Sequence, residues 1–287
     1  MKKIGFLTCS EIPGYGGLLT KYDTEMVEYI RSKGYECDPV IWDREEELEK
    51  FDLLFIRTIW DYYKKYDRFY DFLDEIFIKK IPMLNSPMIV SQNMHKFYLR
   101  KLIARGVNVI DTSFFIKNTR VDLKDIMKLN GWDRVIFKPA ISAGSYLTTL
   151  VNSYSAEHEK QWQHMIRIRD MIVQPFQEEI RQGEISNVFW NNQYKYSLKK
   201  TPRKGDFRVQ FNFGGKYKIH KPSDVVLEEC NKVMKFYGND AFYVRIDGIE
   251  TVNEFKIMEV EMIEPDLYLD YFPEAKYDLA DALMSKL

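Results

Sequence analysis

Short apolar runs alternate with amphipathic segments over the first third of the chain. Apolar runs at residues 3–8, 35–42 and 52–57 predict strands, and a helical spacing of apolar residues predicts helices over about 22–32 and 66–77. Alternation of strands with helices is typical of an α/β unit with a parallel sheet. The N-terminal part of the chain is therefore predicted to be such a unit.

The middle of the chain begins after a stretch at residues 81–87 that contains two prolines and an asparagine. This stretch predicts the first domain boundary. Beyond it the pattern predicts a helix, a strand, a second helix and a short buried strand, at about residues 91–105, 134–138, 156–170 and 171–176. Pro175 ends the last of these strands and predicts a connector into a third unit.

The last third of the chain alternates apolar and polar residues with the period of two that is typical of strands. Antiparallel strands are predicted at residues 183–190, 193–200, 206–213 and 216–220, with hairpin turns at Asn191-Asn192 and Gly214-Gly215. Helices are predicted at about 224–237 and 275–286, on either side of a closing hairpin. The predicted fold class is α/β (α+β), with an N-terminal parallel α/β domain and a C-terminal antiparallel sheet, divided into residues 1–86, 87–173 and 174–287.

The closing hairpin pairs a strand that starts at Tyr243 with one that starts at Phe255, across a turn at Asn253-Glu254. Successive side chains of a strand point to opposite faces, so every second residue shares a face. The shared faces are predicted to hold Tyr243, Arg245 and Asp247 on the first strand and Ile257, Glu259 and Glu261 on the second. Glu264 follows Glu261 by an odd number of residues and is predicted to face the other way, unless Pro265 bends the strand.

Three carboxylates beside one guanidinium are costly to bury without further counter-ions. Mg²⁺ prefers hard oxygen ligands and is commonly completed by substrate phosphates. The hairpin therefore predicts that Asp247, Glu259 and Glu261 hold divalent cations next to a nucleotide. The alternative is a solvated hairpin that merely has one polar face.

Arg57, Trp60 and Asp61 follow the third predicted strand. Ligands of parallel sheets bind in the crevice beyond the carboxyl ends of the strands. We therefore expect these three residues to contact a zwitterionic or acidic substrate. The alternative is that Arg57 pairs with Asp61 while Trp60 packs.

Lys138 ends a predicted strand, and a loop of small residues that includes Ser142 and Gly144 follows it. An ammonium group and unhindered backbone N–H groups suit phosphate oxygens, although the order of residues is not that of a P-loop. Gly14, Gly16 and Gly17 do not follow the dinucleotide-binding order and are interpreted as an ordinary turn.

The bulk composition narrows the function classes. Hydrophobic residues at 45% and charged residues at 30% indicate a globular protein, and a net charge of −1 argues against nucleic-acid binding. The sequence holds no apolar run of the roughly 20 residues that cross a bilayer, and its start is too polar for a signal peptide. Cys9, Cys37 and Cys230 fit neither a disulfide framework nor a zinc motif, so a cytoplasmic location is expected.

Taken together, these motifs resemble the ATP-grasp superfamily over essentially the whole chain. Several segments also resemble the O-ureido-serine cyclo-ligase branch, close to the glutathione synthetase-like ligases: residues 57–62, 138–144, the pair 174–176 and 183–186, and 258–265. The resemblance implies an ATP-grasp fold with a two-lobed ATP-binding region. Many ATP-grasp ligases have Asn where this chain has Glu261, which leaves the number of metal ions open.

The resemblance also implies roles for individual residues. Lys96 and Lys138 match lysines that contact the nucleotide phosphates, and Glu184 matches an acid that commonly binds the ribose. Gln174, Pro175, Phe176 and Gln177 match the segment that holds the adenine. Arg245 matches an arginine that stabilises the transferred phosphoryl group and the anionic intermediate, and Arg208 resembles another phosphate-contacting arginine. Asp247, Glu259 and Glu261 match the Mg²⁺ ligands.

The implied function is an Mg-ATP-dependent carboxylate–amine ligase that acts on a small amino-acid-like substrate through an acyl phosphate. The implied cofactors are ATP and one or two Mg²⁺ ions, with Mn²⁺ as a substitute. Two alternatives stay open, a phosphotransferase of the same fold and a nucleotide-binding module without turnover. No nucleic-acid or membrane partner is expected, and a homodimer is one option for the oligomeric state.

Overall fold

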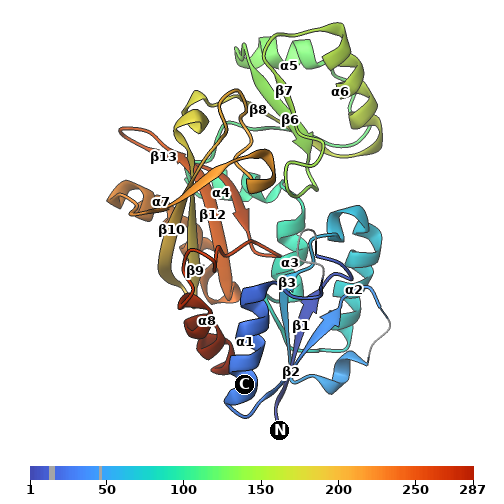
Figure 1. The fold of residues 1–287 in the computed structure, drawn as a ribbon. Coiled ribbons are helices and arrows are strands. Elements are labelled where there is room, and N and C mark those ends of the chain that lie inside the picture. Colours follow the sequence, from blue (N-terminus) through green and yellow to red (C-terminus); the bar gives the residue numbers. More distant parts are fainter. Residues whose placement is uncertain (13–16, 45–46) are drawn as a thin grey trace.

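The structure is a computed structural model that describes residues 1–12, 17–44 and 47–287. Three sheets form three parts of an elongated molecule, and both termini lie at the same end (Figure 1). The turn predicted at Gly14 and Gly16 lies outside the described residues. None of the helices in the described part of the chain is long and apolar enough to span a bilayer.

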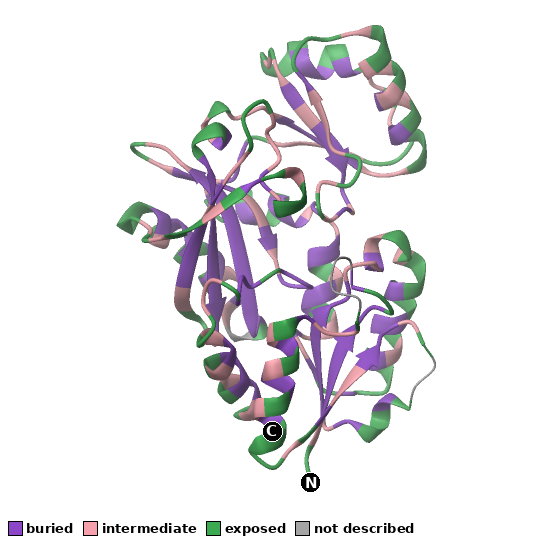
Figure 2. Cartoon of the chain, in the orientation of Figure 1, coloured by how far each residue is buried: buried purple, intermediate pink, exposed green. Residues whose placement is uncertain are grey.

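The N-terminal sheet is parallel and has the strand order β2-β1-β3-β4, which confirms the predicted α/β unit. Its elements are β1 (Lys3–Thr8), α1 (Lys21–Ser32), β2 (Glu36–Ile41), β3 (Leu53–Thr58), α2 (Tyr66–Ile78) and β4 (Met83–Leu84). Strands buried on both faces need continuous apolar runs, and every residue of β3 is buried (Figure 2). The C-terminal helix α8 (Ala275–Met284) packs along α1, where the Tyr29 hydroxyl donates to Asp281 at 3.0 Å (Figure 1).

The central sheet has the strand order β5-β8-β6-β7 and is antiparallel. Its elements are β5 (Ser113–Phe115), α5 (Leu123–Asn130), β6 (Val135–Pro139), β7 (Thr149–Val151), α6 (Ala156–Ile168) and β8 (Met171–Pro175). The two helices share a core with the sheet in which the fully buried Trp162 contacts Phe115 and Phe137 edge to face. This core covers residues 115–173 and forms the upper part of Figure 1.

The C-terminal sheet is antiparallel with the strand order β11-β10-β9-β12-β13. Its elements are β9 (Glu184–Trp190), β10 (Gln193–Thr201), β11 (Lys216–His220), α7 (Asp224–Tyr237), β12 (Tyr243–Glu250) and β13 (Phe255–Glu261). Asn191 and Asn192 both have positive φ angles, 50° and 58°, as a two-residue type I′ hairpin requires. The predicted turn at Asn191-Asn192 is thus confirmed.

Two short helices precede the central sheet, α3 (Pro87–Met94) and α4 (Tyr98–Ile103). The buried apolar residues of α4, and Ile89 of α3, join one core with α7, β9, β12 and β13. Val90 and Met94 of α3 instead join the core of the N-terminal part, where α3 packs on α2. Short 3-10 helices complete the fold at Leu48–Lys50, Tyr62–Lys64, Glu178–Gln182, Phe211–Phe213 and Gly238–Asp240.

The prediction of one helix over residues 91–105 is wrong, because the chain breaks between α3 and α4. His95 adopts an extended conformation there, and the Lys96 amide donates to the Ala140 carbonyl at 2.8 Å instead of to a helical partner. This bond ties the helix break to the loop after β6. The break thereby fixes the backbone of Lys96 beside that loop.

The predicted strand over residues 206–213, and its hairpin at Gly214-Gly215, are also wrong. The Asp206 carboxylate accepts hydrogen bonds from the amides of Phe207 and Arg208, at 2.8 and 3.0 Å. Such side-chain acceptors compete with strand pairing and stabilise a turn. β11 therefore pairs directly with β10.

One predicted face of the closing hairpin is interrupted. The pairing of β12 with β13 shifts between Asp247 and Gly248, so that Asp247 pairs with Glu259 and Gly248 with Ile257. The extra residue, Met258, forms a β-bulge that reverses which face each side chain occupies. Ile257 consequently packs in the core with Val260 and does not share the face of Glu259.

Candidate active site

A cavity of about 540 Å³ lies where the three parts of the molecule meet. Its walls include Trp60 from the N-terminal part, Lys138 from β6 and Asp247 from β12. All of the predicted site residues line it except Arg57 and Asp61. Most of the residues singled out from the sequence are thus brought into one place.

One end of the cavity is apolar. Ile110, Ile180 and Val209 form a small core there, and Phe176 and Met258 pack against it. The segment from Gln174 to Gln177 runs along this end, where the Gln174 amide donates to the Thr112 hydroxyl at 2.9 Å. This end can accommodate a flat apolar group next to polar backbone.

Two lysines and one glutamate form the polar centre of the cavity. Lys138 donates to Glu259 at 2.7 Å, and Lys96 lies 3.7 Å from the same carboxylate. Lys96 also donates to the Ser142 carbonyl at 2.6 Å, which holds the small-residue loop after β6. Burial alone would raise the pKa of Glu259, but the two ammonium groups outweigh it and hold that pKa at about 2.

A third lysine, which the sequence analysis missed, lies beside this centre. Lys200 on β10 is buried, forms an ion pair with Glu184 and lies 3.8 Å from Asp247. Burial lowers its pKa, but the carboxylates of Asp247 and Glu184 raise it well above the ordinary value. The signal was present in the sequence, because Lys200 shares a strand face with Tyr196 and Leu198, which are apolar and buried.

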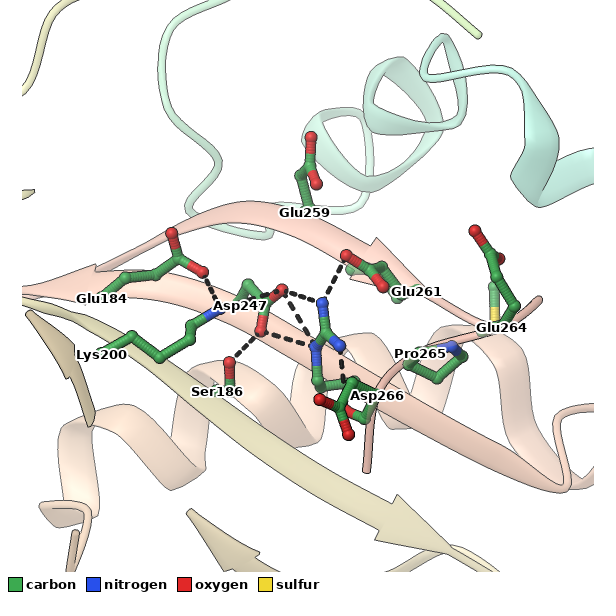
Figure 3. Close-up of polar contacts among 12 residues, drawn as sticks. Glu184, Ser186, Lys200, Asp247, Glu259, Glu261, Glu264, Pro265 and Asp266 are labelled. Carbon is green, nitrogen blue, oxygen red and sulfur yellow. Dashed lines mark hydrogen bonds and ion pairs between the residues drawn. The ribbon is translucent and has the colours of Figure 1, made fainter. Parts of the chain in front are cut away.

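Arg245 forms ion pairs with two acids of the closing strands, Asp247 and Glu261, both of which are labelled in Figure 3. Its guanidinium donates to Asp247 at 2.9 Å, to Glu261 at 2.5 Å and to the Asp266 carbonyl at 2.9 Å. Asp247 also accepts from the Ser186 hydroxyl at 2.5 Å. Burial opposes ionisation of Asp247, but Arg245 and Lys200 hold its pKa below the usual range.

Among Asp247, Glu259 and Glu261, only Glu261 has a raised pKa. Burial and the carboxylates of Asp247 and Glu259 raise its pKa to about 7, although Arg245 acts in the opposite direction. Asp247, Glu259 and Glu261 therefore lie on neighbouring strands, as predicted, but each is engaged by a cation. Among the residues described, no three acids, histidines or cysteines form a ready metal-binding group.

Arg57 and Asp61 have other partners. Arg57 is buried, and it donates to Asp23 at 2.9 Å and to the Pro265 carbonyl at 3.2 Å. Asp61 accepts from the Trp42 indole at 2.7 Å and from Lys65 at 2.6 Å. The alternative of an Arg57–Asp61 pair is therefore wrong, and the sequence could not show that Asp23 of α1 is the true partner.

The prediction for Glu264 is wrong as well. β13 ends at Glu261, so the alternation of strand faces does not extend to Glu264, whose side chain lines the cavity. The Trp60 indole donates to the Glu264 carbonyl at 2.9 Å and holds this segment against the N-terminal part.

Comparison with known proteins bears on the fold. The sequence profile of the family described as "D-cycloserine synthetase DcsG, N-terminal domain" matches residues 4–85. A search of curated proteins gave no match. Among solved structures, D-cycloserine synthetase DcsG superposes with a TM-score of 0.84 at 17% identity, covering 99% of both chains.

Two further structures are similar over nearly their full length. D-alanine–D-alanine ligase from Bacillus anthracis complexed with ATP has a TM-score of 0.69 at 14% identity, covering 99% of this chain and 97% of that chain. The ATP-grasp ligase PsnB, complexed with a precursor variant, Mg and ADP, has a TM-score of 0.62 at 14% identity, covering 99% and 98%. The chain has the ATP-grasp fold.

The similarity to these solved structures confirms the ATP-grasp fold that the motifs predicted. In this ATP-grasp chain the cavity lies between the central sheet and the C-terminal sheet, with the N-terminal part closing one side. Arg208, from the irregular segment after β10, lines the cavity while it pairs with Asp206 at 2.9 Å. The residues predicted to hold nucleotide and metal thus lie on both sheets.

Proposed function

We propose that the protein is an Mg-ATP-dependent carboxylate–amine ligase acting on a small amino-acid-like substrate through an acyl phosphate. The observation that carries the proposal is the pairing of Lys138 with Glu259 inside the cavity between the two sheets. A cation from one lobe meets an acid from the other at the place to which we assign the triphosphate and its metal, which would separate the pair. The similarity to D-cycloserine synthetase and D-alanine–D-alanine ligase supports the choice of ligase chemistry.

The position that we assign to each part of the nucleotide depends on whether the cavity lining is apolar or polar there. We place the adenine at the apolar end along Gln174–Gln177 and the ribose at Glu184, which lines the same wall. The phosphates then reach Lys96 and Lys138. Backbone N–H groups of the loop from Ser142 to Gly144 add donors for their oxygens.

We assign a divalent cation to the carboxylates of the closing strands, which would have to exchange their present partners Lys138 and Arg245 for it. Asp247, Glu259 and Glu261 offer the hard oxygens that Mg²⁺ prefers. A bound triphosphate adds several negative charges to a lining that already contains acidic side chains, so it needs further positive charge. When bound, Mg²⁺ or Mn²⁺ supplies that charge and neutralises the phosphate oxygens during transfer.

The chain's own residues then serve positioning and charge neutralisation. A substrate carboxylate attacks the γ-phosphorus of ATP, and ADP leaves. The amine then attacks the carbonyl carbon of the acyl phosphate. Inorganic phosphate leaves, and the nitrogen gives up a proton as the amide forms. Arg245 and Arg208 neutralise charge on the transferred group, and the cavity walls hold the reactants in line. Arg245 lies beside Glu261 on the floor of the cavity, next to the proposed phosphate path.

The cellular setting follows from the cysteines. Cys9, Cys37 and Cys230 are free and buried, which suits a reducing compartment. We therefore place the ligase in the cytoplasm, and gel filtration would show whether it forms a homodimer.

The experiment is a screen of amino acids and dipeptides with ATP and Mg²⁺, read out as release of inorganic phosphate, with mass spectrometry of the products. A ligase gives phosphate, ADP and an amide. A phosphotransferase gives ADP and a phosphorylated product without free phosphate, and a binding module gives neither. A product lighter than a single substrate by one water indicates cyclisation, whereas joining of two substrates indicates condensation.

A further inference from the structure

Beyond the end of β13 the chain runs along the cavity wall and places Glu264 in it. The residue is only 9% exposed, yet its side chain lines the cavity. Figure 3 shows its carboxylate extending to the same side as that of Glu259. Glu264 is therefore a buried acid in the wall of the cavity to which we assign the substrates.

This carboxylate lacks a counter-ion. In the described part of the chain no lysine, arginine or histidine forms an ion pair with Glu264. Burial and the charge of the neighbouring Glu261 raise the pKa of Glu264 to about 8, against the opposite effect of Arg245 and Lys96. A buried carboxylate that is ionised without a partner is costly, so the site favours a ligand that brings positive charge.

Two aromatic side chains complete the same wall. Trp60 and Tyr62 both line the cavity, and the Trp60 indole donates to the Glu264 carbonyl at 2.9 Å. Tyr62 is 4% exposed, and burial together with the charge of Glu264 raises its pKa well above the usual value. Aromatic rings beside a carboxylate suit a cationic nitrogen, which the ring faces attract.

We propose that Glu264 binds a primary ammonium group of the substrate, against Trp60 and Tyr62. This inference rests on the proposed function and deepens it, since it assigns a subsite for the amino end of the amino-acid-like substrate. Glu264 lines the same cavity as Lys96 and Glu259, so an ammonium group held there shares the cavity with the phosphates that we assign to these residues.

A direct test uses ethylammonium chloride as the probe and the Trp60 indole N–H resonance as the reporter, assigned with Trp60→Phe. We expect a saturable shift of this resonance with ethylammonium, and none with ethanol at matched ionic strength. Glu264→Gln should weaken the binding at least tenfold, whereas Glu274→Gln, at an exposed position, should leave it unchanged. The absence of a saturable shift in the wild type, or equal binding by Glu264→Gln, overturns the inference.

Turnover separates this inference from the proposed function. With any substrate found in the phosphate-release screen, Glu264→Gln should raise KM for the amine-bearing substrate at least tenfold and leave KM for ATP unchanged. A chain that shows the Glu264-dependent shift but no ATP-dependent ligation retains the ammonium subsite and loses the ligase assignment. A ligase whose Glu264→Gln variant keeps the wild-type KM values contradicts the subsite alone.

Discussion

Lys138 at the end of β6 donates to Glu259 of β13 at 2.7 Å and so joins the central sheet to the C-terminal sheet across the cavity. Because the pKa of Glu259 is held at about 2, its carboxylate stays ionised at physiological pH. Each group satisfies the other while no nucleotide is bound. Phosphates beside Lys138 and a cation beside Glu259 would replace these partners with ones of the same sign of charge.

Lys138→Met should weaken ATP binding. A hydrogen bond from a charged donor contributes roughly 1.5–3 kcal/mol, which corresponds to about a 10- to 100-fold rise in Kd. Isothermal titration with ATP and Mg²⁺ measures this change, and Lys128→Met at an exposed position of α5 is the matched control. Equal Kd values for Lys138→Met and the control would remove Lys138 from the nucleotide site.

Lys200→Met should destabilise the fold. It leaves the buried acids Glu184 and Asp247 without a shared cation, and loss of one partner of a buried pair costs about 3–5 kcal/mol. Urea unfolding measures the loss. Lys199→Met, on the opposite face of β10, should change stability by less than about 1 kcal/mol. Similar stability of the two variants would show that the Lys200 network contributes little.

Much of the fold could be predicted because local patterns agree with it, from the parallel N-terminal sheet to the Asn191-Asn192 turn. The failures have two causes. The amide of Lys96 bonds to the distant Ala140 and breaks a predicted helix, and sequence spacing contains no information on that partner. Asp206 turns a predicted strand through the amides of the next two residues, which is a local signal that the prediction of a strand did not take into account.

Site residues that belong to a recognisable motif were predicted well. Site residues whose role depends only on the three-dimensional arrangement were predicted poorly. Lys138 and Glu259 came from motifs. Lys200 and Glu264 were missed, since their roles depend on which face of β10 is buried and on where β13 ends. The bulge at Met258 similarly removes Ile257 from the face it was predicted to share.

Arg57→Met should lower the stability of the fold. Arg57 and Asp23 form a buried pair, and the unpaired Asp23 carboxylate would cost about 3–5 kcal/mol. Asp61→Asn, which weakens a more exposed pair with Lys65, should cost no more than about 1 kcal/mol. Urea unfolding compares the two variants. If Arg57→Met keeps wild-type stability but raises KM for the substrate, Arg57 is a substrate contact as the sequence suggested.

Titration of the Glu264 carboxyl should make the free energy of unfolding decrease as the pH rises. The unfolded carboxyl loses its proton near pH 4.5, whereas the folded one holds it to about pH 8, so the folded state binds more protons between these values. Raising the pH through this window therefore favours unfolding, by up to about 4 kcal/mol at its upper end. Glu264→Gln should remove this dependence.

Urea unfolding in EDTA at pH 5, 7 and 8.5 measures this effect. The variant should gain stability over the wild type as the pH rises, with little difference at pH 5. A difference between the two proteins that does not change with pH would contradict the prediction.

The most direct test of the Mg-ATP site is a titration of ATP binding against Mg²⁺ in the wild type and in Asp247→Asn and Glu259→Gln. The account predicts that Mg²⁺ tightens ATP binding to the wild type at least tenfold, and that each variant loses most of this gain. ATP binding that is independent of Mg²⁺ in the wild type, or equally Mg²⁺-dependent in both variants, would contradict it.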